Sequence, residues 1–280
     1  MRKINSDEIT SAVKKLSMDA NYFLGDDVVE AIKKSIDREE SPLGKEILNQ
    51  ILENAEIAGR EKLPLCQDTG LAAVFVELGS DVHIEGATLE SAIQEGVRQG
   101  YGDGYLRKSI VEDPLRRKNT GDNTPAVIST KVVKGDKVKI IVLPKGGGSE
   151  NMSAIKMLKP SDGEEGVKDF ILETVIKAGG NPCPPIIVGV GIGGSFDKCA
   201  YLAKKSLLRE VGSVNHDSFY AEMEDELLKR INNTGIGPQG LGGRITALAV
   251  HIETHPCHIA SLPVAVNMQC HSARHKEVII

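Results

Sequence analysis

The chain has 280 residues, of which 40 % are hydrophobic and 26 % charged, and its formal net charge is −5. This composition is close to that of ordinary globular proteins, which argues against a disordered or fibrous chain. Aromatic residues make up only 4 % and tryptophan is absent, so there are few side chains on which bases could stack. Together with the negative charge, this argues against nucleic-acid binding.

The cysteines and the N-terminus indicate where the protein works. The five cysteines are odd in number and widely spaced, which suits a reducing compartment better than a disulfide framework. The N-terminus lacks the apolar run of a signal peptide, and no apolar run approaches membrane-spanning length. We therefore expect a cytoplasmic protein with no membrane partner, folded as a single domain over residues 1–280.

Hydrophobic periodicity predicts three helices in the first sixty residues. Ser6 and Asp26 stand where helix N-caps are expected, and Pro42 should begin the third helix. Residues 71–78 then predict a strand and residues 88–99 a helix. The N-terminal region is thus expected to be largely helical.

The middle of the chain carries two β-rich runs between residues 126 and 143, which flank Lys134-Gly135-Asp136-Lys137 and indicate a hairpin. The glycines at 146–148 should open a helix that continues through residues 152–158. Further along, the pattern predicts helices at 164–177, 196–209 and 218–231 and strands at 184–194, 245–252 and 262–266. The expected fold class is α+β, with the helical N-terminal region packed with a mixed β-sheet.

Four of the five cysteines lie in segments that interrupt regular structure. Cys199 is the exception, because it lies inside a predicted helix, where cysteine packs as a small hydrophobic residue. Cys66, Cys183 and Cys270 lie beside proline, glycine or polar residues, and Cys257 is a competitor in a similar setting. Three thiolates on a four-iron cluster leave one iron without a protein ligand, and that iron can act as a Lewis acid. The wide separations form no compact ligand motif, so spacing alone is weak evidence.

Two other cofactors remain as alternatives. The pairs Cys257-His258 and Cys270-His271 would make a Cys₂His₂ zinc set, although their spacing is not the usual one for zinc. The stretch Gly189–Gly194 matches G-x-G-x-x-G after a strand, with Glu210 placed for a ribose contact, as in an NAD-dependent oxidoreductase. Against this, residues 207–211 continue a helix where the fingerprint needs a second strand.

Over nearly its whole length the chain resembles the class I iron–sulfur fumarate hydratases and their L-tartrate dehydratase relatives. The resemblance rests on six blocks in one order: Pro64-Leu-Cys-Gln-Asp-Thr-Gly70, Tyr105-Leu-Arg107, Asn119-Thr-Gly-Asp-Asn-Thr-Pro125, Lys145-Gly-Gly-Gly-Ser-Glu-Asn151, Pro182-Cys-Pro-Pro185 with Gly189–Gly194, and His255-Pro-Cys-His258 through to Cys270. It implies a [4Fe–4S] cluster held by Cys66, Cys183 and Cys270 on loops gathered at one end of the fold. Cys257 would be an accessory thiol.

The activity that the resemblance implies is the reversible hydration of fumarate to (S)-malate, a reaction of the tricarboxylic acid cycle. The alternative is the alpha subunit of L-tartrate dehydratase, because the same chemistry serves a substrate with one more hydroxyl. Asp68 and His258 would then be the catalytic residues, acting around the leaving oxygen.

Substrate binding would fall to four residues, Gln67, Arg107, Gly147 and Gly148. Arg107 offers a bidentate fork for one carboxylate of a small dicarboxylate. The N–H groups of the glycines would favour an anion at the start of the predicted helix. Gln67 directly follows a cluster cysteine, so its side chain should reach a substrate on the open iron.

The chain ends ten residues after Cys270. In single-chain members of the family a further C-terminal domain follows and supplies the proton-abstracting base. The resemblance therefore implies a split enzyme, in which this chain is active with a beta subunit in an α₂β₂ assembly.

Overall fold

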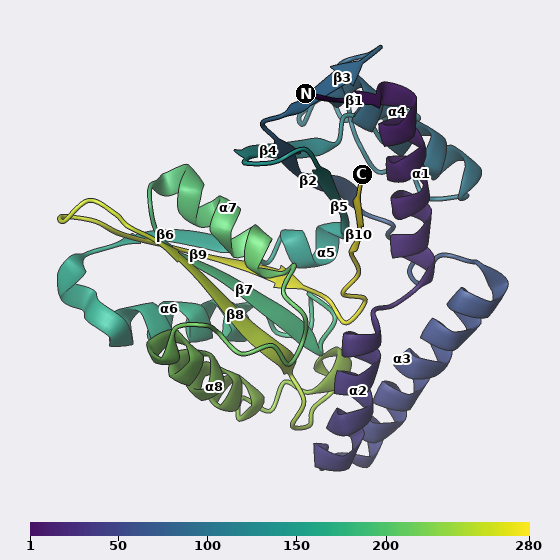
Figure 1. Cartoon of the computed structure of the whole chain (residues 1–280). Helices are drawn as coiled ribbons and strands as arrows, with labels where there is room; N and C mark the ends of the chain where they lie inside the picture. Colours follow the sequence, from purple (N-terminus) through teal and green to yellow (C-terminus); the bar gives the residue numbers. More distant parts are fainter. The chain divides into compact units, whose positions relative to one another are not determined.

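The computed structural model describes residues 1–280 and confirms the α+β class (Figure 1). The chain divides into two compact units, each assembled from stretches far apart in sequence. Unit 1 comprises residues 1–24, 55–147 and 274–280, and unit 2 comprises residues 25–54 and 148–273. That both belong to one functional domain stays a prediction. None of the helices has the length and hydrophobicity needed to cross a lipid bilayer.

Unit 1 is a four-stranded mixed sheet with two helices packed together. Its elements are β1 (Arg2–Asn5), α1 (Ser6–Tyr22), β2 (Leu71–Gly79), β3 (Val82–Glu85), α4 (Leu89–Asp103), β4 (Val127–Val133), β5 (Val138–Lys145) and β10 (Lys276–Ile279). The strand order is β10-β5-β2-β4, and β1 pairs with β3 separately. The apolar stripe of α1, which includes Ile9 and Val13, is buried with Val74 of β2 and Val142 of β5. This burial explains the helical periodicity seen near the N-terminus.

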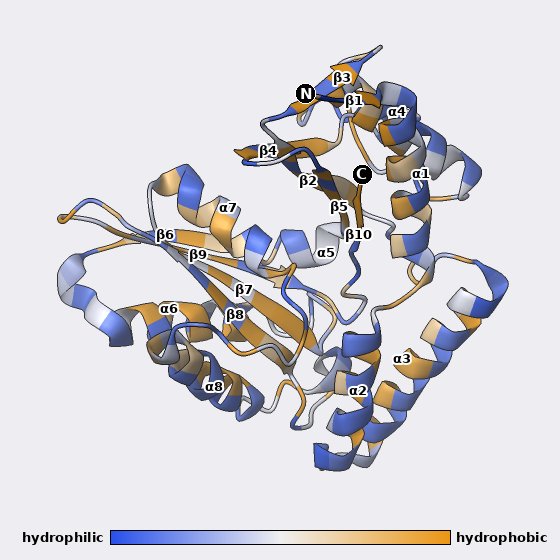
Figure 2. Ribbon diagram, in the orientation of Figure 1, coloured by the Kyte–Doolittle hydropathy of each residue, from blue (hydrophilic) through white to orange (hydrophobic).

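Unit 2 is a second mixed sheet, with strand order β6-β9-β7-β8 and helices on both faces. Its elements are α2 (Asp26–Arg38), β6 (Ala154–Leu158), α6 (Gly163–Ala178), β7 (Ile186–Gly193), α7 (Phe196–Ser206), α8 (Ser218–Asn232), β8 (Ala247–His255) and β9 (Leu262–Gln269). Helices α6 and α8 cover one face and α7 the other (Figure 1). Because the sheet is covered on both sides, β7 is apolar and buried over its whole length, and β8 is buried over its first six residues (Figure 2).

Two helices contribute residues to both units, namely α3 (Pro42–Glu61) and the single turn α5 (Gly147–Glu150). The three helices predicted in the first sixty residues are confirmed, and α3 begins at Pro42 as expected. The N-caps predicted for α1 and α2 each lie one residue C-terminal to the observed N-cap. The side chain of Asn5, rather than Ser6, accepts from the Asp7 N–H at 2.8 Å, and α2 is preceded by Gly25, without a side-chain cap.

The predicted hairpin between residues 126 and 143 is wrong, although both of its strands exist. β2 lies between β4 and β5, parallel to the first and antiparallel to the second. The turn at residues 134–137 closes over the end of β2 instead, since Gly79 N–H donates to Lys137 O and Ser80 N–H to Val133 O. Local turn chemistry could not reveal that a third strand separates the two.

The helix expected over residues 152–158 is also wrong. The glycines open only the four-residue α5, and residues 154–158 form β6, which pairs antiparallel with β9. A short apolar run fits a helix or a strand equally well, and here the edge of the sheet in unit 2 provides the hydrogen-bond partners. The short strands β1, β3 and β10 were not predicted.

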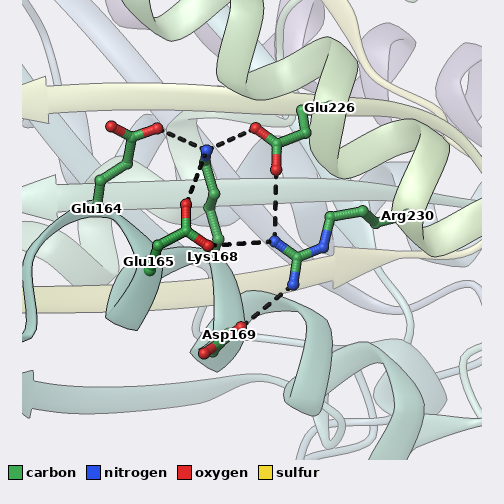
Figure 3. A network of polar contacts seen from close by, with 6 residues as sticks. All are labelled: Glu164, Glu165, Lys168, Asp169, Glu226 and Arg230. Carbon is green, nitrogen blue, oxygen red and sulfur yellow. Dashed lines mark hydrogen bonds and ion pairs between the residues drawn. The ribbon is translucent and has the colours of Figure 1, made fainter.

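A charged network joins α6 to α8 on the surface of unit 2 (Figure 3). The Nζ of Lys168, whose side chain is almost fully buried, contacts Glu164 at 2.5 Å and Glu226 at 2.5 Å. Arg230 pairs with Glu226 at 3.4 Å and with Asp169 at 3.2 Å. The carboxylates of Glu164 and Glu226 raise the pKa of Lys168, so it stays charged and links the two helices that cover the sheet.

The buried carboxylate of Glu39, in the connection between α2 and α3, is hydrogen-bonded to the segment just before β8. Glu39 is 2 % exposed, and its oxygens accept backbone N–H groups from Glu40, Ser41, Arg244 and Ile245 at 2.7–3.0 Å. Burial alone would raise the pKa of Glu39, but these donors together outweigh it and lower the pKa. The charged form is therefore the one that the fold stabilises.

Glu39→Gln is expected to lower the free energy of unfolding at neutral pH by about 2 kcal/mol, because buried donors lose a charged acceptor. The native pKa of Glu39 is depressed, so its contribution is present above the ordinary carboxyl pKa and is lost as pH falls through the native value. Urea unfolding at several pH values measures this, with Glu40→Gln, at an exposed carboxylate beside it, as the control. An undiminished difference between Glu39→Gln and wild type at acid pH would contradict the assignment.

Candidate functional site

The loop Pro64–Gly70 of unit 1 carries the first group of predicted site residues. Cys66 is half-buried, and its Sγ lies 3.4 Å from the Asp68 N–H and 3.3 Å from Gln67 Oε1. The carboxylate of Asp68 accepts the Gly70 N–H at 2.9 Å through Oδ1 and the Gly147 N–H at 2.7 Å through Oδ2. The structure thus brings Cys66, Gln67, Asp68 and Gly147 together.

The glycine run differs from the sequence expectation in how it uses its N–H groups. Only one helical turn follows it, so the aligned dipoles of a long helix are absent. The N–H of Gly147 donates to the carboxylate of Asp68, and in this structure it fixes the orientation of that side chain. Gly148, in unit 2, lies near the Cys183 loop, where an added Cβ would be 3.5 Å from Asn181 O.

A buried layer of polar side chains supports the Pro64–Gly70 loop. The hydroxyl of Tyr101 lies 2.8 Å from Thr69 O and 3.1 Å from Gly70 O, and Asn123 Nδ2 donates to Gly70 O at 3.1 Å. Burial raises the pKa of Tyr101, so it remains a donor. Arg274 Nη2 donates to Asp68 O. Tyr101 and Arg274 were not identified from the sequence, because neither lies in a segment with a recognisable site pattern.

Arg107 contacts this loop through its backbone. Thr69 Oγ1 donates to Arg107 O at 3.1 Å, and the Arg107 residue is exposed while Leu106 before it is buried. Arg107 is thus exposed to solvent, and its binding of a substrate carboxylate stays a prediction.

In unit 2 the structure brings Cys183 and Cys270 to the same end of the sheet. Cys183 precedes β7 and Cys270 follows β9, and these strands are antiparallel neighbours with Ile187 opposite Gln269. The His271 N–H donates to Cys183 O at 3.2 Å, so the two loops are in contact. Cys183 is exposed and Cys270 half-buried, which leaves both thiols accessible.

Gln239 makes hydrogen bonds to both of these loops, and it was not identified from the sequence. Its backbone N–H and its Nε2 donate to Pro184 O at 2.8 and 2.7 Å, and Nε2 lies 3.0 Å from His271 Nδ1. Gln239 holds a positive φ of 52° inside the glycine-rich segment 235–243. That glycine content was the only sequence signal, and it indicated a loop without saying what the loop holds.

The structure does not bring His258 to Cys183 and Cys270. His258 lies in the exposed connection between β8 and β9, where Gly193 at the end of β7 pairs with His255. Cys183 lies before the start of β7, and Cys270 follows the end of β9. An eight-residue strand spans about 23 Å, so the histidine and the two cysteines lie at opposite ends of this sheet.

The zinc alternative is wrong for the same reason. The pairs Cys257-His258 and Cys270-His271 lie at opposite ends of β9. No group of three or more His, Cys, Asp or Glu side chains is arranged to hold a single metal ion. Among the other histidines, His251 lies buried in β8, where burial and then the charge of Arg209 lower its pKa to about 4, so it stays neutral at physiological pH.

The glycines of the G-x-G-x-x-G match serve packing. A Cβ on Gly189 would lie 2.2 Å from Ala203 O, and one on Gly191 would lie 2.0 Å from Cys199 O, so both residues let α7 approach β7 closely. Cys199 is fully buried in that contact, as expected from the sequence. No strand follows α7 before α8, so the second strand of a dinucleotide-binding unit is missing.

Comparison with known proteins identifies the family. The model of the fumarate hydratase (Fumerase) family matches residues 10–279. A protein of Methanocaldococcus jannaschii, "Putative L(+)-tartrate dehydratase subunit alpha", is 46 % identical over 273 residues, covering 95 % of this chain and 95 % of its own. The "L(+)-tartrate dehydratase subunit alpha" of Escherichia coli O157:H7 is 36 % identical over 276 residues, covering 98 % and 91 %. The chain therefore belongs to the fumarate hydratase family of hydro-lyases.

Proposed function

We propose that this chain is the alpha subunit of an L(+)-tartrate dehydratase. The observation that carries the proposal is the agreement of its relatives, which match it over more than nine tenths of both chains and bear that name. The sequence blocks alone favour fumarate hydration with tartrate dehydration as the alternative, whereas the relatives favour tartrate dehydration. Both reactions remove water from a hydroxylated C4 dicarboxylate.

The cofactor we propose is a [4Fe–4S] cluster held by Cys66, Cys183 and Cys270. Two features of the chain fit it: all three thiols lie on loops and are accessible, unlike that of Cys199, and the loops of Cys183 and Cys270 lie against each other. The loop of Cys66 is also backed by a buried arginine, which suits a site that gains negative charge. When bound, such a cluster supplies Lewis acidity at an iron without a protein ligand.

Asp68 and Gln67 are the side chains that we assign to the substrate beside Cys66. Two backbone N–H groups orient the Asp68 carboxylate, so its free lone pairs are fixed in direction and can hold or pass a proton. Gln67 is exposed and adjacent to the thiol, where it can bind a substrate hydroxyl or carboxylate. Arg107 would bind a carboxylate, and Gly147 and Gly148 remain proposed contacts through their backbone.

His258 requires a different arrangement, because its own sheet separates it from Cys183 and Cys270. We propose that it enters the active site of a neighbouring alpha subunit in an α₂β₂ assembly. Its loop is exposed and presents Ile259, which is 92 % exposed, as a large apolar side chain available for contact with another chain. The beta subunit would supply the base that removes the proton from carbon.

The proposed function is tested by an anaerobic assay of the alpha chain loaded with iron and sulfide, alone and with its beta subunit. With the partner, we expect L-tartrate to be dehydrated with kcat/KM about a hundredfold or more above that for malate, because a site that hydrogen-bonds the second hydroxyl rejects a substrate without it. The alpha chain alone should show no turnover. D-Tartrate and fumarate are the matched comparisons.

Faster turnover of malate and fumarate than of L-tartrate would restore fumarate hydration as the function. Full turnover by the alpha chain alone would contradict the split active site.

A further inference from the structure

Arg274 is a buried cation with unfilled hydrogen-bonding capacity. The residue is 3 % exposed, and one guanidinium nitrogen, Nη2, donates to the backbone carbonyl of Asp68. The other two nitrogens, Nε and Nη1, are buried and have no hydrogen-bond partner. The nearby Asp68 carboxylate is engaged by the N–H groups of Gly70 and Gly147.

Burying the Arg274 guanidinium without partners for two of its nitrogens lowers the free energy of unfolding. A buried charge is stable only when it is paired and hydrogen-bonded, and an unsatisfied charged donor loses more than a neutral one does. Buried polar groups without partners are rare in native proteins, and those that persist mark strain, an unseen ion or a functional role. The unsatisfied donors of Arg274, Nε and Nη1, therefore indicate that a negative charge is bound or develops near them.

The Pro64–Gly70 loop does not need Arg274 as its only anchor. Tyr101 binds the carbonyls of Thr69 and Gly70, and Asn123 binds Gly70 O as well. A neutral donor at position 274 would suffice to bind the remaining carbonyl of Asp68. What the guanidinium adds at this place is a permanent positive charge.

The source of negative charge lies on the same short loop. The thiol of Cys66 contacts the N–H of Asp68, while Arg274 binds the carbonyl of that residue. A charge that develops on the Cys66 sulfur therefore arises one residue's backbone away from the guanidinium. Because Arg274 is buried, solvent screens its charge less than that of an exposed residue, and this strengthens the attraction.

We propose that Arg274 is a positioning residue for the cluster, the counter-charge for the thiolate that Cys66 becomes when it binds iron. This inference rests on the proposed function, because it presumes that Cys66 is a cluster ligand. Arg274 acts through the Cys66–Asp68 loop and need not touch the substrate. Without the cluster, the buried charge of Arg274 lowers the free energy of unfolding. With the cluster bound, the same charge stabilises the cluster-loaded protein.

The test compares Arg274→Met, Arg274→Gln and Arg274→Lys in the whole alpha–beta complex, with and without the cluster. Methionine keeps the approximate volume, glutamine keeps a donor without charge, and lysine keeps the charge. We expect the Met and Gln variants to lose iron to a chelator about tenfold or more faster than wild type, and the Lys variant to lie close to wild type. Their cluster reduction potentials should be more negative, because the cation that favours the reduced state is gone.

The cluster-free proteins provide the readout that separates charge from simple packing. The apo Met variant should melt at the same temperature as the wild type or higher, since replacing an unpaired buried charge by an apolar side chain is often neutral or stabilising. A lower apo melting temperature together with normal iron retention would show a purely structural residue and overturn the proposal. Equal iron retention by the Gln and Lys variants would overturn it as well. A wild-type chain that takes up no cluster would overturn the proposed function itself, and this inference with it.

Discussion

Replacing Cys66, Cys183 or Cys270 by serine is expected to remove the cluster and to lower tartrate dehydration by about a thousandfold or more. The size of the effect follows from the Lewis acid, which contributes several kcal/mol to the stabilisation of developing charge, at about 1.4 kcal/mol for each factor of ten. Iron and sulfide analysis and electron paramagnetic resonance of protein purified without air measure the cluster directly. Activity with the beta subunit measures the consequence.

The chain offers two control cysteines for this experiment. Cys199 is buried between α7 and the sheet of unit 2, so Cys199→Ser should keep the cluster and lower the free energy of unfolding by about 1–3 kcal/mol. Cys257 lies at the opposite end of that sheet from Cys183 and Cys270, so Cys257→Ser should also keep the cluster. Stoichiometric zinc without sulfide, or full cluster retention in the Cys270 variant, would refute the proposed ligand set.

Mixing two inactive variants is expected to restore activity if His258 serves a neighbouring subunit. His258→Asn should lower kcat by about a hundredfold or more, the usual contribution of a positioned acid or base, and Cys270→Ser should be inactive for want of a cluster. In an α₂β₂ complex with one copy of each, the chain with an intact cluster site receives His258 from the other chain. One of the two active sites is then complete, and the mixed complex should show up to half of wild-type activity.

The alternative gives a clearly different result. If His258 acted on the cluster of its own chain, neither site of the mixed complex would hold both groups, and activity would stay at the level of the single variants. Two different affinity tags on the alpha chains allow the mixed complex to be purified. A complex of two His258→Asn chains, carried through the same procedure, is the matched control for activity from contaminating wild type.

The sequence by itself determined the fold class, the positions of nearly all long helices and strands, and the family. These rest on information carried locally, because an amphipathic helix such as α1 or a buried strand such as β7 must show its periodicity or its apolar run wherever it packs. The six family blocks likewise lie in single stretches of chain. The same locality explains the correct assignment of Cys199 to packing, since Ala200, Leu202 and Ala203 in the same helix are themselves small or apolar.

The tertiary structure decided which segments meet. β2 lies between β4 and β5, the two strands that were predicted to form a hairpin. Residues 154–158 form a strand because they pair with β9, and the pairing of β7 with β9 brings Cys270 close to Cys183. The directions of the strands likewise separate His258 from those cysteines. The C-terminal segment packs against the Pro64–Gly70 loop and so places the buried Arg274 beside Asp68. Such contacts join residues tens or hundreds of positions apart, and their energies depend on partners that no local pattern specifies.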